Sequence, residues 1–221
     1  MNFNVLARKV AKGTAPSAYG GSMNVEDMIR FALMQGAAGA DEIDRLCAQH
    51  GWLANGLLED GTRVAPFARW AQVCAAYGRG GVAALQAQLS DRELATFAIA
   101  VLAHVKTVES VRALTEFCES ADWRSPDVTH ADWQALSALN QLLSFKGGVL
   151  IDALLQDRLR RMGLKAYDRA SKPFLASLCL CAIRGAATPE SLAWLQALET
   201  ADVHNDAARV NALKAIKRQL A

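Results

Sequence analysis

Residues 94–122 read LATFAIAVLAHVKTVESVRALTEFCESAD, and residues 175–203 follow the same pattern 81 positions later as LASLCLCAIRGAATPESLAWLQALETADV. Each stretch has an apolar helix-forming segment, a short turn and a second segment opened by a threonine. A threonine hydroxyl can cap a helix by accepting a hydrogen bond from an unpaired backbone N–H. Two similar helix–turn–helix units are therefore predicted. Their identical positions are Leu94/Leu175, Ala95/Ala176, Thr107/Thr188, Glu109/Glu190, Ser110/Ser191 and Leu114/Leu195.

The chain around these stretches also predicts helices. Ser90 and Glu93 match the capping-box pattern at the start of the first stretch. A middle helix pair fits between the two stretches, and its second helix is predicted to end at Gly163. No segment alternates apolar and polar residues over a strand length. The predicted fold is all-α with about 10–11 helices. The apolar stripe predicted for the second helix of the middle pair is Ile151, Leu154, Leu155, Leu159 and Met162.

The pattern predicts one helical domain after an N-terminal arm. Residues 1–22 end in a stretch rich in glycine and serine, so we expect an arm and a flexible link. Residues 23–89 predict irregular helices, residues 90–203 predict three helix pairs, and residues 204–221 predict a capping helix with a polar outer face. A single helical-repeat domain is therefore expected over residues 23–221.

Residues 90–220 resemble a HEAT or armadillo-like helical repeat protein. One helix pair takes about 40 residues in such arrays, and the offset between the two stretches is about twice that length. The resemblance implies a right-handed α-solenoid of antiparallel helix pairs, with the second helices of successive pairs lining a concave face. It also implies a protein-binding function, although a few proteins with HEAT-like folds are DNA glycosylases.

Composition limits the classes of protein to which the chain can belong. Of its 221 residues 52% are hydrophobic, and 24 basic against 22 acidic side chains leave a formal net charge of +2. The hydrophobic content predicts a sizeable core, and the small net charge disfavours nucleic acid or a membrane surface as the main partner. Five cysteines without C-x-x-C spacing favour buried thiols over a disulfide framework. We expect no signal peptide and a cytoplasmic location.

No motif for catalysis, metal binding or cofactor binding is recognisable in the sequence. The four histidines are scattered and have neither H-E-x-x-H nor paired-cysteine spacing. The Gly-Gly pairs lack the spacing of a Walker phosphate loop and are interpreted as helix ends. We therefore expect no enzyme activity, no catalytic residue, no metal ligand and no cofactor.

Residues 158–172 carry the one local excess of positive charge. Only Asp168 is acidic in this segment, and Tyr167 lies among the cations. One interpretation is a solvated helix end whose cations face the C-terminal carbonyl groups. The other is a basic patch for an acidic protein or a nucleic acid. The basic residues are Arg158, Arg160, Arg161, Lys165, Arg169 and Lys172.

A mixed-charge face is predicted on the second helices of the pairs. Glu116 and Glu119 lie off the apolar stripe of their helix, and a HEAT-like array would bring them near Gln156 and Arg160. Trp194 and the loop residue Trp123 are aromatic candidates for binding, with packing of the ring as the alternative for each. The predicted partner-binding residues are Arg112, Glu116, Glu119, Arg158, Arg160, Arg161 and Trp194.

Two functions from different classes are compatible with this sequence. The first is a non-catalytic module that binds another protein through a concave, mixed-charge face. A bacterial immunity protein that neutralises a toxin or effector is one form of this function. The alternative is a nucleic-acid-binding or DNA-glycosylase-like HEAT-repeat protein that uses the basic segment 158–172.

Overall fold

The structure is a computed structural model. Among the residues it describes, every regular element is an α-helix and no strand occurs, which confirms the all-α prediction. The arm predicted for residues 1–22, and nearly all of the chain predicted as irregular helices before residue 65, lie outside the described residues. The chain divides into two compact units, residues 1–104 and 105–221. The described residues are 36–38, 41, 45, 65–125, 129–144, 148–170, 172–200 and 202–221.

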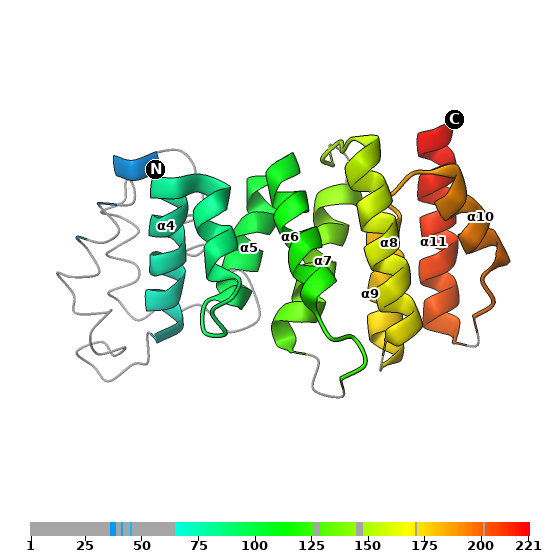
Figure 1. The fold of residues 1–221 in the computed structure, drawn as a ribbon, viewed down its shortest axis with the longest axis horizontal. Coiled ribbons are helices and arrows are strands. Elements are labelled where there is room, and N and C mark those ends of the chain that lie inside the picture. Colours follow the sequence, from blue (N-terminus) through cyan, green and yellow to red (C-terminus); the bar gives the residue numbers. More distant parts are fainter. Residues whose placement is uncertain are drawn as a thin grey trace. The chain divides into compact units, whose positions relative to one another are not determined.

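In the first unit, the long described helix is α4 (Ala65–Gln88), and α5 (Ala95–Val105) follows it and ends at the boundary (Figure 1). Helix α4 is kinked at Gly81, whose φ of 60° and ψ of −147° suit a residue without a Cβ atom. Its fully buried side chains include Val73, Cys74 and Leu85. Both helices therefore bury apolar side chains, and those of α5 include Ile99, Val101 and Leu102.

The start of α5 differs from the predicted capping box. The carboxylate of Asp91 accepts a hydrogen bond from the Glu93 N–H at 2.8 Å, while the Ser90 hydroxyl donates to the Ala87 carbonyl of the preceding helix at 3.0 Å. The Glu93 carboxylate forms an ion pair with Arg69. The predicted capping box is therefore wrong, because the Ser90 hydroxyl and the Glu93 carboxylate each have another partner. Asp91 lies before the turn that leads into α5, and its backbone carbonyl accepts a hydrogen bond from the Ala95 N–H at 2.8 Å.

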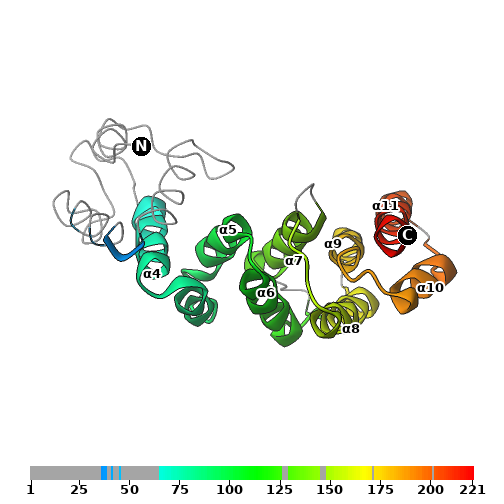
Figure 2. The ribbon, with the colours of Figure 1, turned by 90° about the horizontal axis from the view of Figure 1, so that it is seen from above.

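The second unit has two layers of helices. Helices α7, α9 and α11 lie side by side in one layer, and α6, α8 and α10 lie in the other (Figure 2). Helix α9 is central, because it packs against α7, α8 and α11. The buried cluster where α9, α10 and α11 meet comprises Leu180, Ile183, Leu195, Ala208, Ala212 and Ile216. The bounds are α6 (Val108–Ser120), α7 (His130–Ser144), α8 (Ala153–Arg169), α9 (Pro173–Ile183), α10 (Pro189–Ala197) and α11 (Val203–Leu220).

Packing between the layers in the second unit joins helices of successive predicted pairs. Helix α8 packs mainly on α9, and α10 packs mainly on α11. Gly163 permits the close approach of α8 to α9, since a Cβ atom at this position would lie 2.4 Å from Ile183 Cγ1. The prediction that Gly163 ends its helix is wrong, because α8 continues to Arg169. Gly163 is a packing residue inside the helix.

The two similar stretches have the same N-cap. Thr107 Oγ1 accepts a hydrogen bond from the Ser110 N–H at 3.3 Å, and Thr188 Oγ1 accepts one from the Ser191 N–H at 3.1 Å. Each threonine hydroxyl also lies 3.2 Å from the hydroxyl of its serine, and both serines are fully buried. The threonine caps predicted from the sequence are confirmed.

Removing either cap is expected to destabilise the protein by a similar amount. Thr107→Ala or Thr188→Ala should each lower the free energy of unfolding by about 1 kcal/mol, because a first-turn N–H loses its hydrogen-bond acceptor. Urea denaturation followed by circular dichroism measures this difference. Thr→Ser at each position is the matched control and should retain most of the stability. An unchanged stability in both alanine variants would contradict the role of the caps.

The same caps also affect two glutamates in the first turn of their helices. The pKa of Glu109 lies below its ordinary value, because the carboxylate accepts hydrogen bonds from its own backbone N–H and, with a smaller effect, from the Thr107 hydroxyl. The pKa of Glu190 is lowered in the same way, by its own backbone N–H and then by the Thr188 hydroxyl. A carboxyl group with a lowered pKa stabilises the fold above its ordinary pKa, and this contribution is lost as the pH falls through the folded-state value. We expect Thr107→Val to raise the pKa of Glu109 in an NMR titration and to leave Glu190 unchanged.

Candidate functional site

All seven predicted partner-binding residues lie in one layer of the second unit. Helix α6 carries three of them, α8 carries three, and α10 carries the tryptophan (Figure 2). The structure brings Arg158, Glu116 and Glu119 together between α6 and α8, and it leaves Arg112 and Arg161 exposed. The residues are Arg112, Glu116 and Glu119 on α6, Arg158, Arg160 and Arg161 on α8, and Trp194 on α10.

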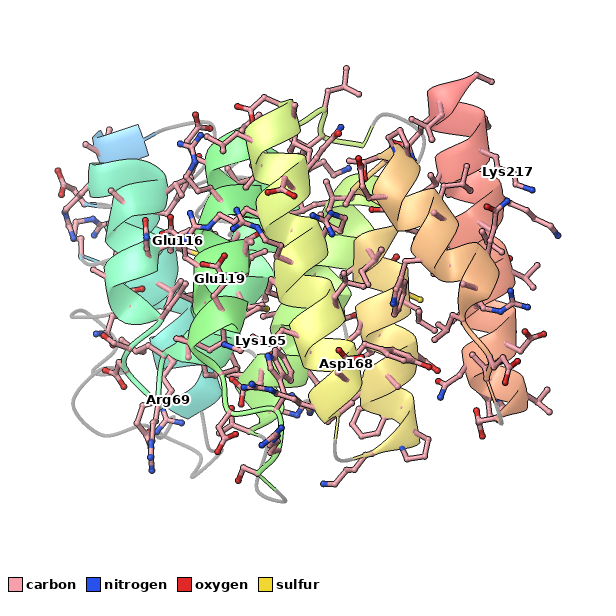
Figure 3. The ribbon with its side chains drawn as sticks, turned by 45° about the vertical axis from the view of Figure 1, so that its right-hand side comes forward. Arg69, Glu116, Glu119, Lys165, Asp168 and Lys217 are labelled. Atoms are coloured by element: carbon pink, nitrogen blue, oxygen red, sulfur yellow. The ribbon has the colours of Figure 1, made fainter. Side chains whose placement is uncertain are left out.

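Arg158 bridges two of the three carboxylates of α6, Glu116 and Glu119. Its Nη1 lies 2.9 Å from Glu116 Oε1, and its Nη2 and Nε lie 2.6 and 2.8 Å from the two carboxylate oxygens of Glu119. Figure 3 shows both glutamates on the side of α6 that faces α8. The hydrogen bonds to Glu119 are the largest cause that raises the pKa of the Arg158 guanidinium above its ordinary value. Two-point contacts of this kind fix direction as well as distance, so the network holds α8 to α6.

The predicted neighbours of the α6 glutamates are wrong in one respect. Glu116 and Glu119 meet Arg158, whereas Arg160 binds Asp157 at 2.6 Å. Two residues along a helix differ by about 200° in direction, so Arg158 and Arg160 point to different neighbours. The pKa of Glu190 on α10 is also influenced by the charges of Arg160 and Asp157, after larger effects from its own N-cap. Arg160 therefore belongs to the contact between α8 and α10.

Two of the predicted arginines remain open to solvent. Arg112 is exposed on α6, and the side chain of Arg161 is 65% exposed. Arg161 Nη2 lies 3.1 Å from Asp157 Oδ2. The other carboxylate oxygen of Asp157, Oδ1, accepts a hydrogen bond from Arg160. The hydrogen bond from Arg160 is the largest cause that lowers the pKa of Asp157. An exposed pair one helical turn apart contributes little to stability, so Arg161 is available to a partner.

The two aromatic candidates differ in their environment. Trp194 is half-buried and packs edge-on against Tyr167 of α8, with ring centroids 5.4 Å apart and an interplanar angle of 86°. Trp123 is 1% exposed, and its indole N–H donates to the Cys118 carbonyl at 3.1 Å. The hypothesis that Trp123 binds a partner is therefore wrong, because the loop returns its ring to the core. Trp194 also packs against the buried cluster of α9, α10 and α11, and it stays a candidate because it is only half-buried.

Two exposed leucines were not recognised as surface residues in the sequence. Leu150 is 89% exposed and Leu154 is 76% exposed, although the apolar stripe of the helix was predicted to include Leu154. The buried residues of α8 are Leu155, Leu159 and Met162, and Leu154 points away from them. Its spacing of seven residues from Arg161 places both side chains on the same face, which is the signal that could have identified it.

Other chemistry has little support within the described part of the chain. No three histidine, cysteine, aspartate or glutamate side chains there are grouped as metal ligands. No disulfide joins the four described cysteines, and three of them are buried. Burial raises the pKa of the Cys179 thiol to about 12, which disfavours the reactive thiolate. Among the same residues, no helix combines the length and the apolar character that crossing a membrane requires.

Removing the bridging cation tests the α6–α8 network. Arg158→Met should lower the free energy of unfolding by about 1 kcal/mol, because the pairs are one-third exposed and partly screened by water. The difference should shrink in 1 M NaCl. Arg161→Met is the matched control on the same helix and should change stability by less than about 0.5 kcal/mol. Equal effects of the two variants in urea denaturation would contradict the bridging role of Arg158.

Comparisons of this chain with family models, with curated proteins and with solved structures find no match.

Proposed function

We propose that the chain is a non-catalytic protein-binding module, built as a HEAT-like α-solenoid. Its binding face is formed by the outward side chains of α6, α8 and α10, which we call the α6–α8–α10 face. The observation that carries this proposal is the gathering of all seven predicted contact residues in this one layer. Partner binding through a shared layer is the usual way in which a helical array functions.

The geometry supports a face that is organised before a partner binds. Arg158 is held by two carboxylates, and Arg160 is held by Asp157, so these side chains have little freedom left to lose. Preorganised side chains reduce the entropy cost of association. Arg112 and Arg161 remain exposed and supply charge that a partner can contact. Because arginine is enriched among the residues that dominate binding energies, these two are the proposed contacts.

One form of this proposal is a bacterial immunity protein that neutralises a toxin or effector. Such a protein needs a stable fold, a charged surface and no active site of its own. The fixed charges of the α6–α8–α10 face support this form, since charge complementarity gives fast and selective association. Identification of the captured partner as a toxin, and protection of cells by expression of the chain, would support it. A captured partner without toxic activity would overturn this form alone.

The experiment begins with affinity capture of the partner by the tagged full chain from its source cell. Binding of the purified partner is then measured for Arg112→Glu/Arg161→Glu and for the control Lys214→Glu/Lys217→Glu. Both pairs change the net charge equally, but the control lies on α11 (Figure 3 labels Lys217). We expect the first pair to weaken binding about tenfold or more and the control to have little effect. Equal weakening by both pairs would contradict the proposed face.

Nucleic-acid binding is tested in parallel with a short single-stranded RNA and a short DNA duplex. Arg158 and Arg160 are neutralised by carboxylates of the chain itself, so we expect no binding at low salt. Binding that falls steeply with added salt would instead support a nucleic-acid function, because phosphate contacts release counterions.

A further inference from the structure

The exposed side of α8 carries a distinct line of side chains. Leu154, Arg161, Lys165 and Asp168 are all exposed, and their spacing of 7, 11 and 14 residues from Leu154 places them within about 60° around the helix. Figure 3 shows Lys165 and Asp168 on this helix. Leu150 lies just before the helix begins. We use the name α8 ridge for Leu150, Leu154, Arg161 and Lys165.

The N-terminal end of the α8 ridge is apolar. Leu150 and Leu154 are four positions apart and expose most of their side chains, 89% and 76% respectively. A single exposed leucine needs no explanation, but two largely exposed leucines at the same end of a helix gain free energy when a partner covers them. These leucines lie beside the predicted contact residues, because α8 also carries Arg161. They therefore extend the α6–α8–α10 face with an apolar end.

The C-terminal part of the α8 ridge is basic. Arg161, Lys165 and the neighbouring Arg169 are exposed, against one exposed aspartate, Asp168. Asp157, the other carboxylate of this helix, is already bound by Arg160 and Arg161. Arg161 lies about 10 Å from Leu154 along the helix axis. The ridge therefore presents apolar and positive groups in a fixed order.

We propose that the α8 ridge docks an acidic amphipathic segment of a partner protein. Apolar side chains of that segment cover Leu150 and Leu154, and its carboxylates meet Arg161 and Lys165. This inference rests on the proposed protein-binding function and specifies the partner's chemistry. Apolar burial supplies affinity, while complementary charges set the register and speed association. A protein segment fits this order better than a nucleic acid, whose phosphates match the basic part of the ridge only.

The probe is a display library of random 15-residue peptides, selected against the immobilised full chain. Enriched peptides are expected to combine leucine or phenylalanine with a group of aspartates or glutamates. The leading peptide should bind Leu150→Ser/Leu154→Ser and Arg161→Glu/Lys165→Glu at least about tenfold more weakly than the original chain. A peptide with the same composition in scrambled order should lose affinity by a similar factor, since the ridge has a fixed order.

Matched controls lie on α11. Val203→Ser removes an apolar side chain that is equally exposed, and Lys214→Glu/Lys217→Glu repeats the charge change. Both controls should bind the leading peptide within about twofold of the original chain. All substituted side chains are exposed, so each variant should keep its helical circular dichroism and melting temperature, and these measurements confirm that folding is intact.

Three outcomes would overturn the proposal. These are enrichment of basic or uncharged peptides, unchanged binding by both ridge variants, and absence of any enriched peptide. Acidic peptides whose binding is lost in Arg112→Glu but not in the ridge variants would reject the ridge and leave the proposed function intact. Absence of peptide enrichment together with failed partner capture would reject both.

Discussion

Replacing Trp123 with alanine is expected to lower the free energy of unfolding by about 3–5 kcal/mol. The ring is 1% exposed, and its indole N–H donates to the Cys118 carbonyl at 3.1 Å. Alanine removes this packing and leaves both a cavity and a buried carbonyl without that donor. Urea denaturation should be followed by far-ultraviolet circular dichroism, because the four other tryptophans would also contribute to fluorescence.

A conservative variant separates packing from hydrogen bonding at this position. Trp123→Phe retains an aromatic ring and loses the donor, so it should be less destabilising than Trp123→Ala by at least about 1 kcal/mol. Loss of less than about 1 kcal/mol in the alanine variant would contradict the burial of Trp123. It would also restore the hypothesis that this ring is free to bind a partner.

The effect of Gly163→Ala on the free energy of unfolding is expected to depend on the residue at position 183. The substitution should destabilise the protein beside isoleucine and stabilise it beside alanine. In the original chain, the added Cβ atom would lie 2.4 Å from Ile183 Cγ1 and 3.0 Å from Cδ1. The clash should cost more than the helix propensity that alanine gains, so Gly163→Ala should be destabilising by about 1–2 kcal/mol. Ile183→Ala alone should cost about 2–5 kcal/mol, because Ile183 is fully buried.

In the Ile183→Ala background the nearest remaining atom of that side chain is Cβ, at 3.8 Å from the added methyl group. Gly163→Ala should then stabilise the protein by about 1 kcal/mol, through helix propensity. The four free energies of unfolding form a double-mutant cycle that measures the coupling directly. Additive effects would contradict the close approach of α8 and α9.

The features that sequence could predict are local in character. The N-caps at Thr107 and Thr188 depend on residues within three positions, and both are found where the sequence places them. The all-α class follows from apolar spacing within each segment. The capping box predicted at Ser90 and Glu93 is wrong, because the Ser90 hydroxyl donates to the preceding helix and the Glu93 N–H donates to Asp91.

The features that sequence could not predict depend on contacts between distant segments. Arg158 and Arg160 have equal charge and similar positions, and only the rotation of α8 against α6 decides which one meets Glu119. Gly163 has the appearance of a helix end until Ile183 is known to lie against it. Trp123 occurs in a polar loop, and its burial depends on where that loop returns to the core.

Hydroxyl-radical footprinting of the full chain, with and without its captured partner, tests the α6–α8–α10 face most directly. Leucine and tryptophan side chains react readily when exposed, so Leu150, Leu154 and Trp194 report on this face. Val203 and Leu220 report on α11. We predict that partner binding lowers oxidation of the first three and leaves the α11 residues unchanged. Protection of Val203 and Leu220, with Leu154 and Trp194 still fully reactive, would contradict binding through this face.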